Sequence, residues 1–182
     1  MIFTPIPLDG AFVIDLEKKE DDRGFFSRMI CENEFTAHGL VDHFSQVNDS
    51  FSAHKGTLRG MHYQLAPWAE TKVIRCVRGA LYDLILDLRP DSPTFGESFG
   101  VELSAENRRM IYVPKGFAQG SFILADNTEA FYFADEFYAP EHERGVRYND
   151  PKFKLRWPGP PIVISDKDKN HPDFDAAWHL GR

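Results

Sequence analysis

The sequence of 182 residues has few cysteines: Cys31 and Cys76 stand far apart and form no CxxC pair. A disulfide framework or a cysteine-rich zinc site is therefore not expected, and a reducing compartment is favoured. No apolar run approaches the roughly 20 residues that span a bilayer. The N-terminus also lacks the basic start and long apolar stretch of a secretory signal. We expect a cytoplasmic protein without a membrane partner.

Basic residues are also scarce, with 21 Lys and Arg against 28 Asp and Glu, which gives a formal net charge of −7. Proteins that bind nucleic acids broadly usually present a basic face, so this composition argues against a nucleic-acid partner. It remains compatible with a small nucleotide held by a few local Arg and Lys side chains.

Repeats, low-complexity segments and linkers are absent from the sequence, and its length fits one domain, 1–182, with a substantial core. Gly and Pro punctuate the chain at short intervals and aromatic residues reach 14%, which favours an all-β fold. The pattern predicts a strand in KVIRCVR (72–78), a turn at Gly79 and a returning strand in ALYDLILDLR (80–89). Further strands are predicted in GESFGVELS, RRMIYVP, GSFILAD and TEAFYFADEFY.

Helix signals are few. Short helices are predicted in ENEFTAHGL, which ends near Gly39, and in DFDAAWHL near the C-terminus. The stretch RWPGPPIVISDKD is too rich in proline for a helix, so residues 157–182 are predicted to form an extended C-terminal tail over the sheet. These elements fit a small antiparallel barrel or jelly roll, whose open mouth can hold a site.

The densest functional signal is KGTLRGMHYQ (55–64), where strand alternation places His62 and Gln64 on one face. An inward histidine needs hydrogen-bonding partners, and a structural and a functional histidine are both open interpretations from these residues alone. Many small barrels bind a metal through a His-x-His pair, but here Gln64 takes the second position. A ligand set such as His54, His62 and His142 stays open, yet its spacing does not support it, and we expect no metal.

Longer segments together resemble the dTDP-4-dehydrorhamnose 3,5-epimerase family: DDRGFF (21–26), KGTLRGMHYQ (55–64), ETKVIRCVRGALYDLILDLRPDSPTFG (70–96), VELSAENRRMIYVPKGFAQG (101–120), EFYAPEHERGVRYNDP (136–151) and ISDKD (164–168). The resemblance implies a cupin-type jelly roll and a homodimer that exchanges N-terminal strands. It implies an isomerase that needs no cofactor and epimerises a nucleotide-linked 4-keto-6-deoxyhexose at C3, C5 or both. Such enzymes supply deoxysugars for natural-product glycosides or for surface polysaccharides such as the O-antigen of lipopolysaccharide.

The resemblance also assigns roles to four residues. It makes His62 the proton-abstracting base, a task for which the near-neutral pKa of histidine is suited. It makes Asp168 the carboxylate that orients the imidazole, Tyr132 the acid on the opposite face of the sugar, and Lys72 the cation beside the C4 oxygen. Without the resemblance, Asp168 and Lys72 would be interpreted as ordinary surface charges and Tyr132 as a core residue.

The nucleotide half of the substrate is represented by further matches. Arg23 and Phe26 match family residues that reach the nucleotide of the neighbouring subunit. Arg59 and Lys167 match diphosphate contacts, which suit charge-assisted hydrogen bonds. Gln46 and Asn48 match a strand beside the base and ribose, and Tyr138 matches the ring that stacks on the pyrimidine. Glu143 also matches a binding position of the family.

Two residues depart from the family pattern. Gln119 in GFAQG replaces the usual histidine, and glutamine cannot titrate, which leaves open a monofunctional 3- or 5-epimerase. Arg28 replaces a glutamate that can accept the N3–H of thymine. Because arginine only donates, a CDP-linked sugar is an alternative to a dTDP-linked one, unless Arg28 turns outward or pairs with an acid such as Glu143. A cupin that binds sugar nucleotides without catalysis is a third interpretation.

Overall fold

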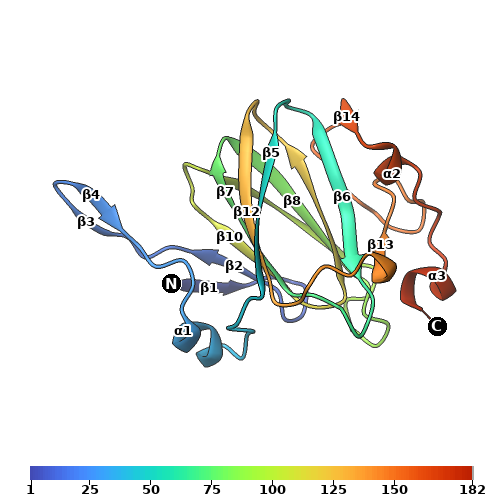
Figure 1. Cartoon of the computed structure of the whole chain (residues 1–182), viewed down its shortest axis with the longest axis horizontal. Helices are drawn as coiled ribbons and strands as arrows, with labels where there is room; N and C mark the ends of the chain where they lie inside the picture. Colours follow the sequence, from blue (N-terminus) through green and yellow to red (C-terminus); the bar gives the residue numbers. More distant parts are fainter. Residues whose placement is uncertain (182) are drawn as a thin grey trace.

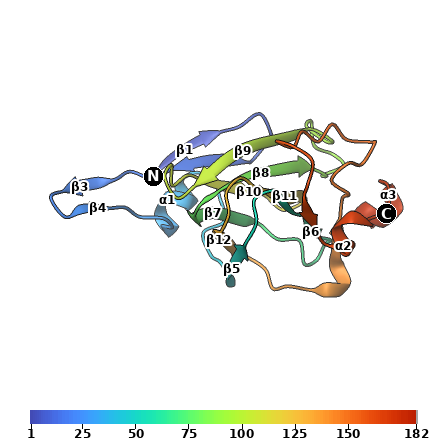
Figure 2. The ribbon, with the colours of Figure 1, turned by 90° about the horizontal axis from the view of Figure 1, so that it is seen from above.

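The computed structural model describes residues 1–181, and most of its regular structure is β-strand. Two six-stranded sheets face each other (Figures 1 and 2). The first sheet contains, in spatial order, β1 (Ile2–Pro5), β2 (Phe12–Asp15), β10 (Met110–Val113), β7 (Lys72–Arg78), β12 (Thr128–Ala134) and β5 (Gln46–Ser52). The second contains β13 (Glu143–Gly145), β6 (Thr57–Gln64), β11 (Phe117–Ile123), β8 (Ala80–Asp87) and β9 (Ser98–Ser104), with β14 (Val163–Ile164) parallel to β6. The predicted all-β jelly roll is confirmed.

Successive strands from β5 to β8, and again from β10 to β13, alternate between the two sheets. The strands predicted on either side of Gly79 therefore exist, but the turn carries the chain from the first sheet to the second instead of closing a paired hairpin. Gly79 has a φ of +71°, and a Cβ there would lie 2.4 Å from Thr128 Oγ1. Only glycine fits this corner without strain.

Apolar side chains from both sheets fill the space between them, including Ile85 and Ile111, which are fully buried. Burying one such side chain stabilises the fold by about 1.5–3 kcal/mol. The outer face of the second sheet is covered as well, because Leu84 and Leu86 belong to a cluster packed against Trp157 of the C-terminal segment. β8 is thus buried on both faces, which explains its nearly continuous apolar sequence.

The C-terminal segment folds back over the second sheet and is not extended throughout. It contains α2 (Asp166–Lys169) and α3 (Ala176–Leu180). The side chain of Ser165 caps α2, and that of Asp175 caps α3, so each short helix has a local start signal. α3 confirms the helix predicted in DFDAAWHL, whereas α2 was not predicted. Residue 182 of the predicted tail lies outside the described residues.

The N-terminal region adds a helix and an arm. α1 (Glu32–Ala37) confirms the predicted first helix and buries Phe35 against the first sheet. β3 (Lys19–Asp21) and β4 (Gly24–Phe26) form a two-stranded arm that projects from the barrel (Figures 1 and 2). A one-turn 3-10 helix, η1 (Pro140–His142), precedes β13. Within residues 1–181, none of the helices has the length and apolar character needed to cross a membrane.

Candidate active site

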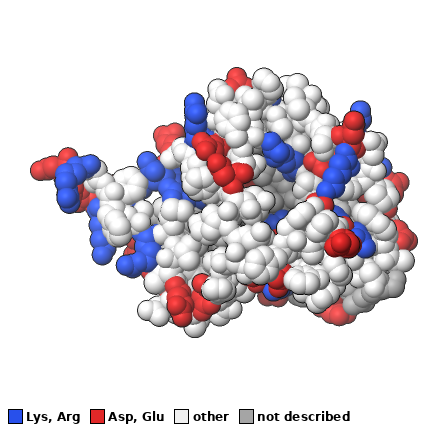
Figure 3. Space-filling view, viewed as in Figure 1, with Lys and Arg blue, Asp and Glu red and all other residues white. Residues whose placement is uncertain are grey.

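Two adjoining cavities of about 330 and 410 Å³ share His62, Lys72 and Tyr132 in their linings. Figure 3 shows Lys and Arg side chains around a hollow on the face where β5 and β6 are visible in Figure 1. His62 comes from β6 of the second sheet, whereas Lys72 and Tyr132 come from β7 and β12 of the first. A histidine therefore lies on one wall, and a lysine and a tyrosine lie on the other.

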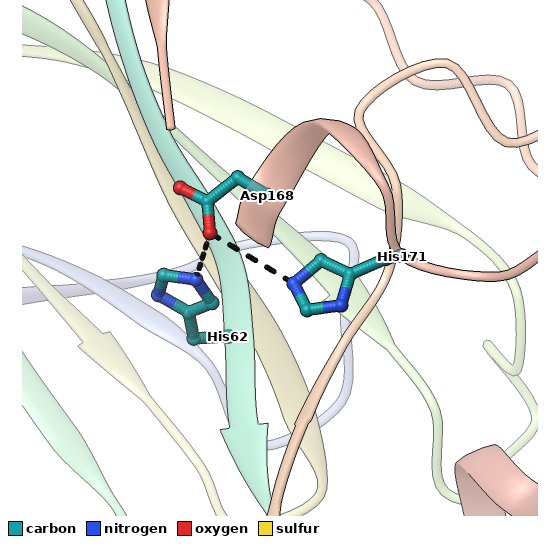
Figure 4. Close-up of side chains that lie close together, drawn as sticks. All are labelled: His62, Asp168 and His171. Carbon is teal, nitrogen blue, oxygen red and sulfur yellow. Dashed lines mark hydrogen bonds and ion pairs between the residues drawn. The ribbon is translucent and has the colours of Figure 1, made fainter. Parts of the chain in front are cut away.

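Asp168 holds the ring of His62. His62 Nε2 lies 2.6 Å from Asp168 Oδ1 (Figure 4), and the other carboxylate oxygen accepts the backbone N–H of Gly60 at 3.1 Å. Burial alone would raise the pKa of Asp168, but the hydrogen bonds from His62 and Gly60 outweigh burial and lower it. Asp168 is therefore ionised and accepts the hydrogen on Nε2. The His62 Nδ1 lone pair is left to accept a proton.

The facing wall offers a cation and a proton donor. Lys72 is only 9% exposed, and its Nζ lies 3.0 Å from Glu70 Oε1. Burial raises the pKa of Tyr132, and the negative charge of Glu70 raises it further, so the phenol keeps its proton at neutral pH. These groups can stabilise an enolate and return a proton to it.

Gln119 lies beside His62 in the register of β11 and β6. Its Nε2 donates to Asp83 Oδ2 at 2.7 Å and to Ser121 Oγ at 3.1 Å. Because both amide hydrogens are engaged, Gln119 has only its carbonyl oxygen, an acceptor, left for a ligand in the cavity that it lines. Burial raises the pKa of Asp83 to about 7, although the hydrogen bonds from Ser121 and Gln119 and the charge of Lys72 oppose the rise.

The larger cavity extends to an exposed aromatic ring. Tyr138 is 57% exposed, its hydroxyl donates to Glu143 Oε2 at 2.9 Å, and its backbone N–H donates to Gln46 Oε1 at 2.9 Å. Glu143 also forms an ion pair with Lys167 of α2. The buried side chain of Gln64 bonds three backbone groups in the adjoining loops, which fixes the segment that carries Tyr138.

Comparisons with known proteins agree with this arrangement. The family model described as dTDP-4-dehydrorhamnose 3,5-epimerase matches residues 5–176. The chain belongs to this family. A curated dTDP-4-dehydrorhamnose 3,5-epimerase from Shigella flexneri is 44% identical over 182 residues, which cover 99% of each chain.

Solved structures of other family members share the fold. A dTDP-4-dehydrorhamnose 3,5-epimerase from Bacillus anthracis, with TDP and PPi bound, is 40% identical with a TM-score of 0.91, covering 95% of this chain and 99% of its own. ChmJ, a 3'-monoepimerase from Streptomyces bikiniensis in complex with dTDP-quinovose, is 33% identical with a TM-score of 0.87, covering 97% and 90%. The resemblance found in the motifs is confirmed, and the protein is an isomerase of the sugar-nucleotide epimerase type.

Most residues expected from the epimerase resemblance come together around the cavities. Nine of them are lining residues: Gln46, Asn48, Arg59, His62, Lys72, Gln119, Tyr132, Tyr138 and Glu143. Asp168 and Lys167 contact two of these nine from α2. Arg59 is fixed to β5 by hydrogen bonds to Ser52 Oγ and to the carbonyl of Phe51. The chemical roles of these residues stay predictions.

Arg23, Phe26 and Arg28 lie elsewhere, on or beside the projecting arm. Arg23 pairs with Asp21, and Phe26 is 64% exposed. Arg28 Nη1 lies 3.8 Å from Glu34, so the acidic partner of Arg28 is Glu34 and not Glu143. Since the resemblance assigns Arg23 and Phe26 to the site of a neighbouring subunit, their role stays a prediction.

Sequence reasoning missed three residues of this region and the structural role of a fourth. Glu70 lies two positions before Lys72, so a search for charges at strand spacing could have found it. Asp83 interrupts an apolar strand, which is itself a sign of a buried functional or paired charge. Gln64 was recognised on the strand but not as the anchor of the Tyr138 loop. His171 had no signal, because its segment was predicted to be extended.

Proposed function

We propose that this family member inverts C3 and C5 of a dTDP-linked 4-keto-6-deoxyhexose by proton exchange. The placement of the His62–Asp168 pair on one wall, with Tyr132 and Lys72 on the other, carries the proposal. The bound TDP and dTDP-quinovose in the two structural relatives support thymidine as the nucleoside. The C4 ketone acidifies the neighbouring C–H bonds, so the proposed chemistry requires no redox cofactor.

In the first half of the reaction, His62 Nδ1 removes the proton from the carbon beside the ketone. The electron pair moves into the enolate, and Lys72 faces the charge that develops on O4. Asp168 stabilises the imidazolium while the proton resides on His62. Positioned acid–base catalysis of this kind contributes about 10²–10⁴-fold in rate.

In the second half, Tyr132 delivers its phenolic proton to the same carbon from the opposite face, and the C4 ketone reforms. Inversion follows because the proton leaves toward one sheet and returns from the other. Exchange with solvent takes the proton from His62 and reprotonates Tyr132. Repetition at the second carbon beside the ketone gives the doubly inverted sugar.

The experiment that tests this proposal is incubation with dTDP-4-keto-6-deoxyglucose in D₂O, followed by NMR. We expect deuterium at both C3 and C5 with the wild-type protein and at neither carbon with His62→Ala. Absence of exchange in the wild type, or undiminished exchange in His62→Ala, would refute the mechanism. A folded His62→Ala protein, verified by circular dichroism, is required for the second conclusion.

Inversion of a single carbon is a second candidate that two observations favour. Gln119 presents an acceptor where the family usually has a titratable histidine, and the relative ChmJ is named a 3'-monoepimerase. The same NMR experiment separates the two candidates, because a monoepimerase incorporates deuterium at one carbon only.

The nucleotide preference is a separate question, because Arg28 replaces the acceptor expected for thymine. We favour dTDP, since the two structural relatives hold thymidine nucleotides and Arg28 is paired with Glu34. Calorimetry with dTDP and CDP distinguishes these nucleotides. Tighter binding of CDP would overturn the preference for dTDP.

We further propose a homodimer in the cytoplasm. The arm projects from the barrel (Figure 1), and although Arg108 lies over the ring of Phe25, Phe26 is left 64% exposed. The edge strand β5 exposes Val47 and Phe51, so both surfaces are suited to a second copy. Cys31 and Cys76 are free thiols, which fits a reducing compartment. Light scattering of the wild type should give twice the chain mass. A variant that lacks residues 18–27 should give the mass of one chain.

A further inference from the structure

We propose that His171 converts the His62–Asp168 pair into an inhibitory zinc site. The inhibitory part of this proposal rests on the proposed role of His62 as the base. The binding part rests on geometry alone and can be measured without any substrate.

His62, Asp168 and His171 each offer one potential ligand atom at this point, and the three atoms lie within 4.8 Å of one another. Nε2 of each histidine is the atom nearest to Asp168 Oδ1 in the two ion pairs. Figure 4 shows both imidazoles directed toward the same carboxylate oxygen, at 2.6 Å for His62 and 3.8 Å for His171. Zinc bound tetrahedrally at about 2.0–2.2 Å requires neighbouring ligand atoms to be about 3.3 Å apart. Shifts of less than about 1 Å in these side chains would meet that requirement.

His171 is positioned for binding, and its contact with Asp168 at 3.8 Å is too long for a hydrogen bond. Its side chain is only 8% exposed, and Nε2 is buried without a hydrogen bond among the described residues. Gly145 makes room for it, because a Cβ on that residue would lie 2.0 Å from His171 Nε2. A buried polar atom without a hydrogen bond destabilises the fold, and a bond to a metal ion would offset this cost.

The donor set and the local charge favour zinc over the harder cations. Two imidazoles and one carboxylate, with a water as fourth ligand, form a common zinc set, whereas magnesium and calcium prefer oxygen ligands. The ion pairs described for Asp168 are with the two histidines only, so its negative charge is available to a cation. Lys167, the neighbouring cation, is paired with Glu143.

Zinc at this position would change the tautomer of His62 and thereby prevent His62 from abstracting a proton. Coordination needs the lone pair on Nε2, so the remaining ring hydrogen must lie on Nδ1. The nitrogen proposed to accept the substrate proton then becomes a donor. Zinc would also neutralise Asp168, which could no longer stabilise an imidazolium.

The location of the site predicts the kinetic pattern. The residues described as lining the two cavities include His62 but neither Asp168 nor His171. A metal behind His62 leaves the substrate space open, so zinc should lower kcat with little change in KM. EDTA should restore the full rate.

The test is a calorimetric titration of tag-free protein with zinc chloride, with the epimerase rate measured in parallel. We expect one zinc per chain and at least about tenfold weaker binding in His171→Leu, since loss of a group that merely orients a metal ligand already costs about 10–100-fold. His171→Leu keeps the apolar packing beside Trp178. Inhibition is measured within each protein, as the ratio of the rate with zinc to the rate with EDTA, and this ratio should be closer to one in His171→Leu than in the wild type. His171→Ala is a second variant for the case in which leucine disturbs the fold.

The matched control is His54→Ala, which removes an exposed histidine outside the cluster and should leave zinc binding unchanged. Absence of saturable zinc binding, or equal affinity in the wild type and both folded His171 variants, would overturn the site. Full activity with the site saturated would overturn the inhibitory role. An inactive wild-type protein that still binds zinc through His171 would refute the proposed function and leave the metal site standing.

Discussion

Two buried carboxylates lie behind two neighbouring cavity residues, and their environments are opposite. Asp168 stands behind His62 on β6, and Asp83 stands behind Gln119 on the adjacent β11. The bonds from His62 and Gly60 overcome burial and lower the pKa of Asp168. Burial prevails at Asp83, whose hydrogen-bond donors Gln119 and Ser121 are neutral, and its pKa rises to about 7. Of the two carboxylates, Asp168 is the one hydrogen-bonded to a side chain that can become positive, so Asp168 is the one placed to stabilise an imidazolium.

The largest expected effect is a difference in kcat between variants of the two carboxylates. Asp168→Asn should lower kcat about 10³–10⁴-fold, because asparagine cannot stabilise the His62 imidazolium, as in other carboxylate–histidine pairs. Asp83→Asn should change kcat less than about threefold, within the small effects of losing a neutral hydrogen bond. Steady-state rates of the two purified variants provide the comparison. Equal losses in both variants would show that Asp83 also acts through a charge.

The pH dependence of stability should have opposite signs at the two positions. The folded-state pKa of Asp83 is raised from 3.8 to about 7, so its ionisation destabilises the fold as pH rises through this window. The full change is on the order of 4 kcal/mol at 1.36 kcal/mol per pKa unit. The lowered pKa of Asp168 stabilises the fold above its usual pKa, and this contribution is lost as pH falls.

Urea unfolding at pH 5 and pH 8 measures this difference. Relative to the wild type, Asp83→Asn should gain stability at pH 8 compared with pH 5. Asp168→Asn should lose the same stability at both pH values, because the usual and the lowered pKa of Asp168 both lie below pH 5, and this loss should shrink only in more acidic solution. If the difference in unfolding free energy between Asp83→Asn and the wild type were the same at pH 5 and pH 8, the Asp83 carboxyl of the wild type would be ionised at both pH values. The contrast with Asp168 would then disappear.

A smaller effect on the exchange rate is expected when Gln119 is replaced by the titratable histidine that is usual in the family. Gln119→His gives Asp83 a partner that can become positive, so the pKa of Asp83 should fall toward its usual value. Exchange at the slower of the two carbons should rise about tenfold, at the lower end of acid–base contributions. NMR in D₂O compares C3 and C5 in one sample. Unchanged ratios would show that Gln119 does not determine how many carbons react.

The sequence predicted the elements of the fold better than their connections. Alternation and turn residues located most of the strands, but they could not show that Gly79 joins different sheets, because both arrangements use the same local turn. The helix α2 was missed because four residues carry little periodicity and the preceding prolines indicated an extended chain. That helix is the element that brings Asp168 to His62.

The site itself was accessible only through the family motifs. His62 and Asp168 are 106 positions apart, and no spacing rule joins residues so distant. Neighbouring charges such as Glu70 depend on the packing of side chains around the cavity. The gap between His171 and Gly145 likewise depends on how the C-terminal segment folds back over β13.

The most direct test of the two-walled site is deuterium exchange with Tyr132→Phe. If His62 removes the proton and Tyr132 returns it from the facing wall, this variant should still incorporate solvent deuterium beside the ketone while the carbon keeps its configuration. Wild-type protein in the same D₂O experiment should incorporate deuterium with inversion. Inversion at the wild-type rate in Tyr132→Phe, or loss of exchange as complete as in His62→Ala, would contradict the assignment of base and acid to opposite walls.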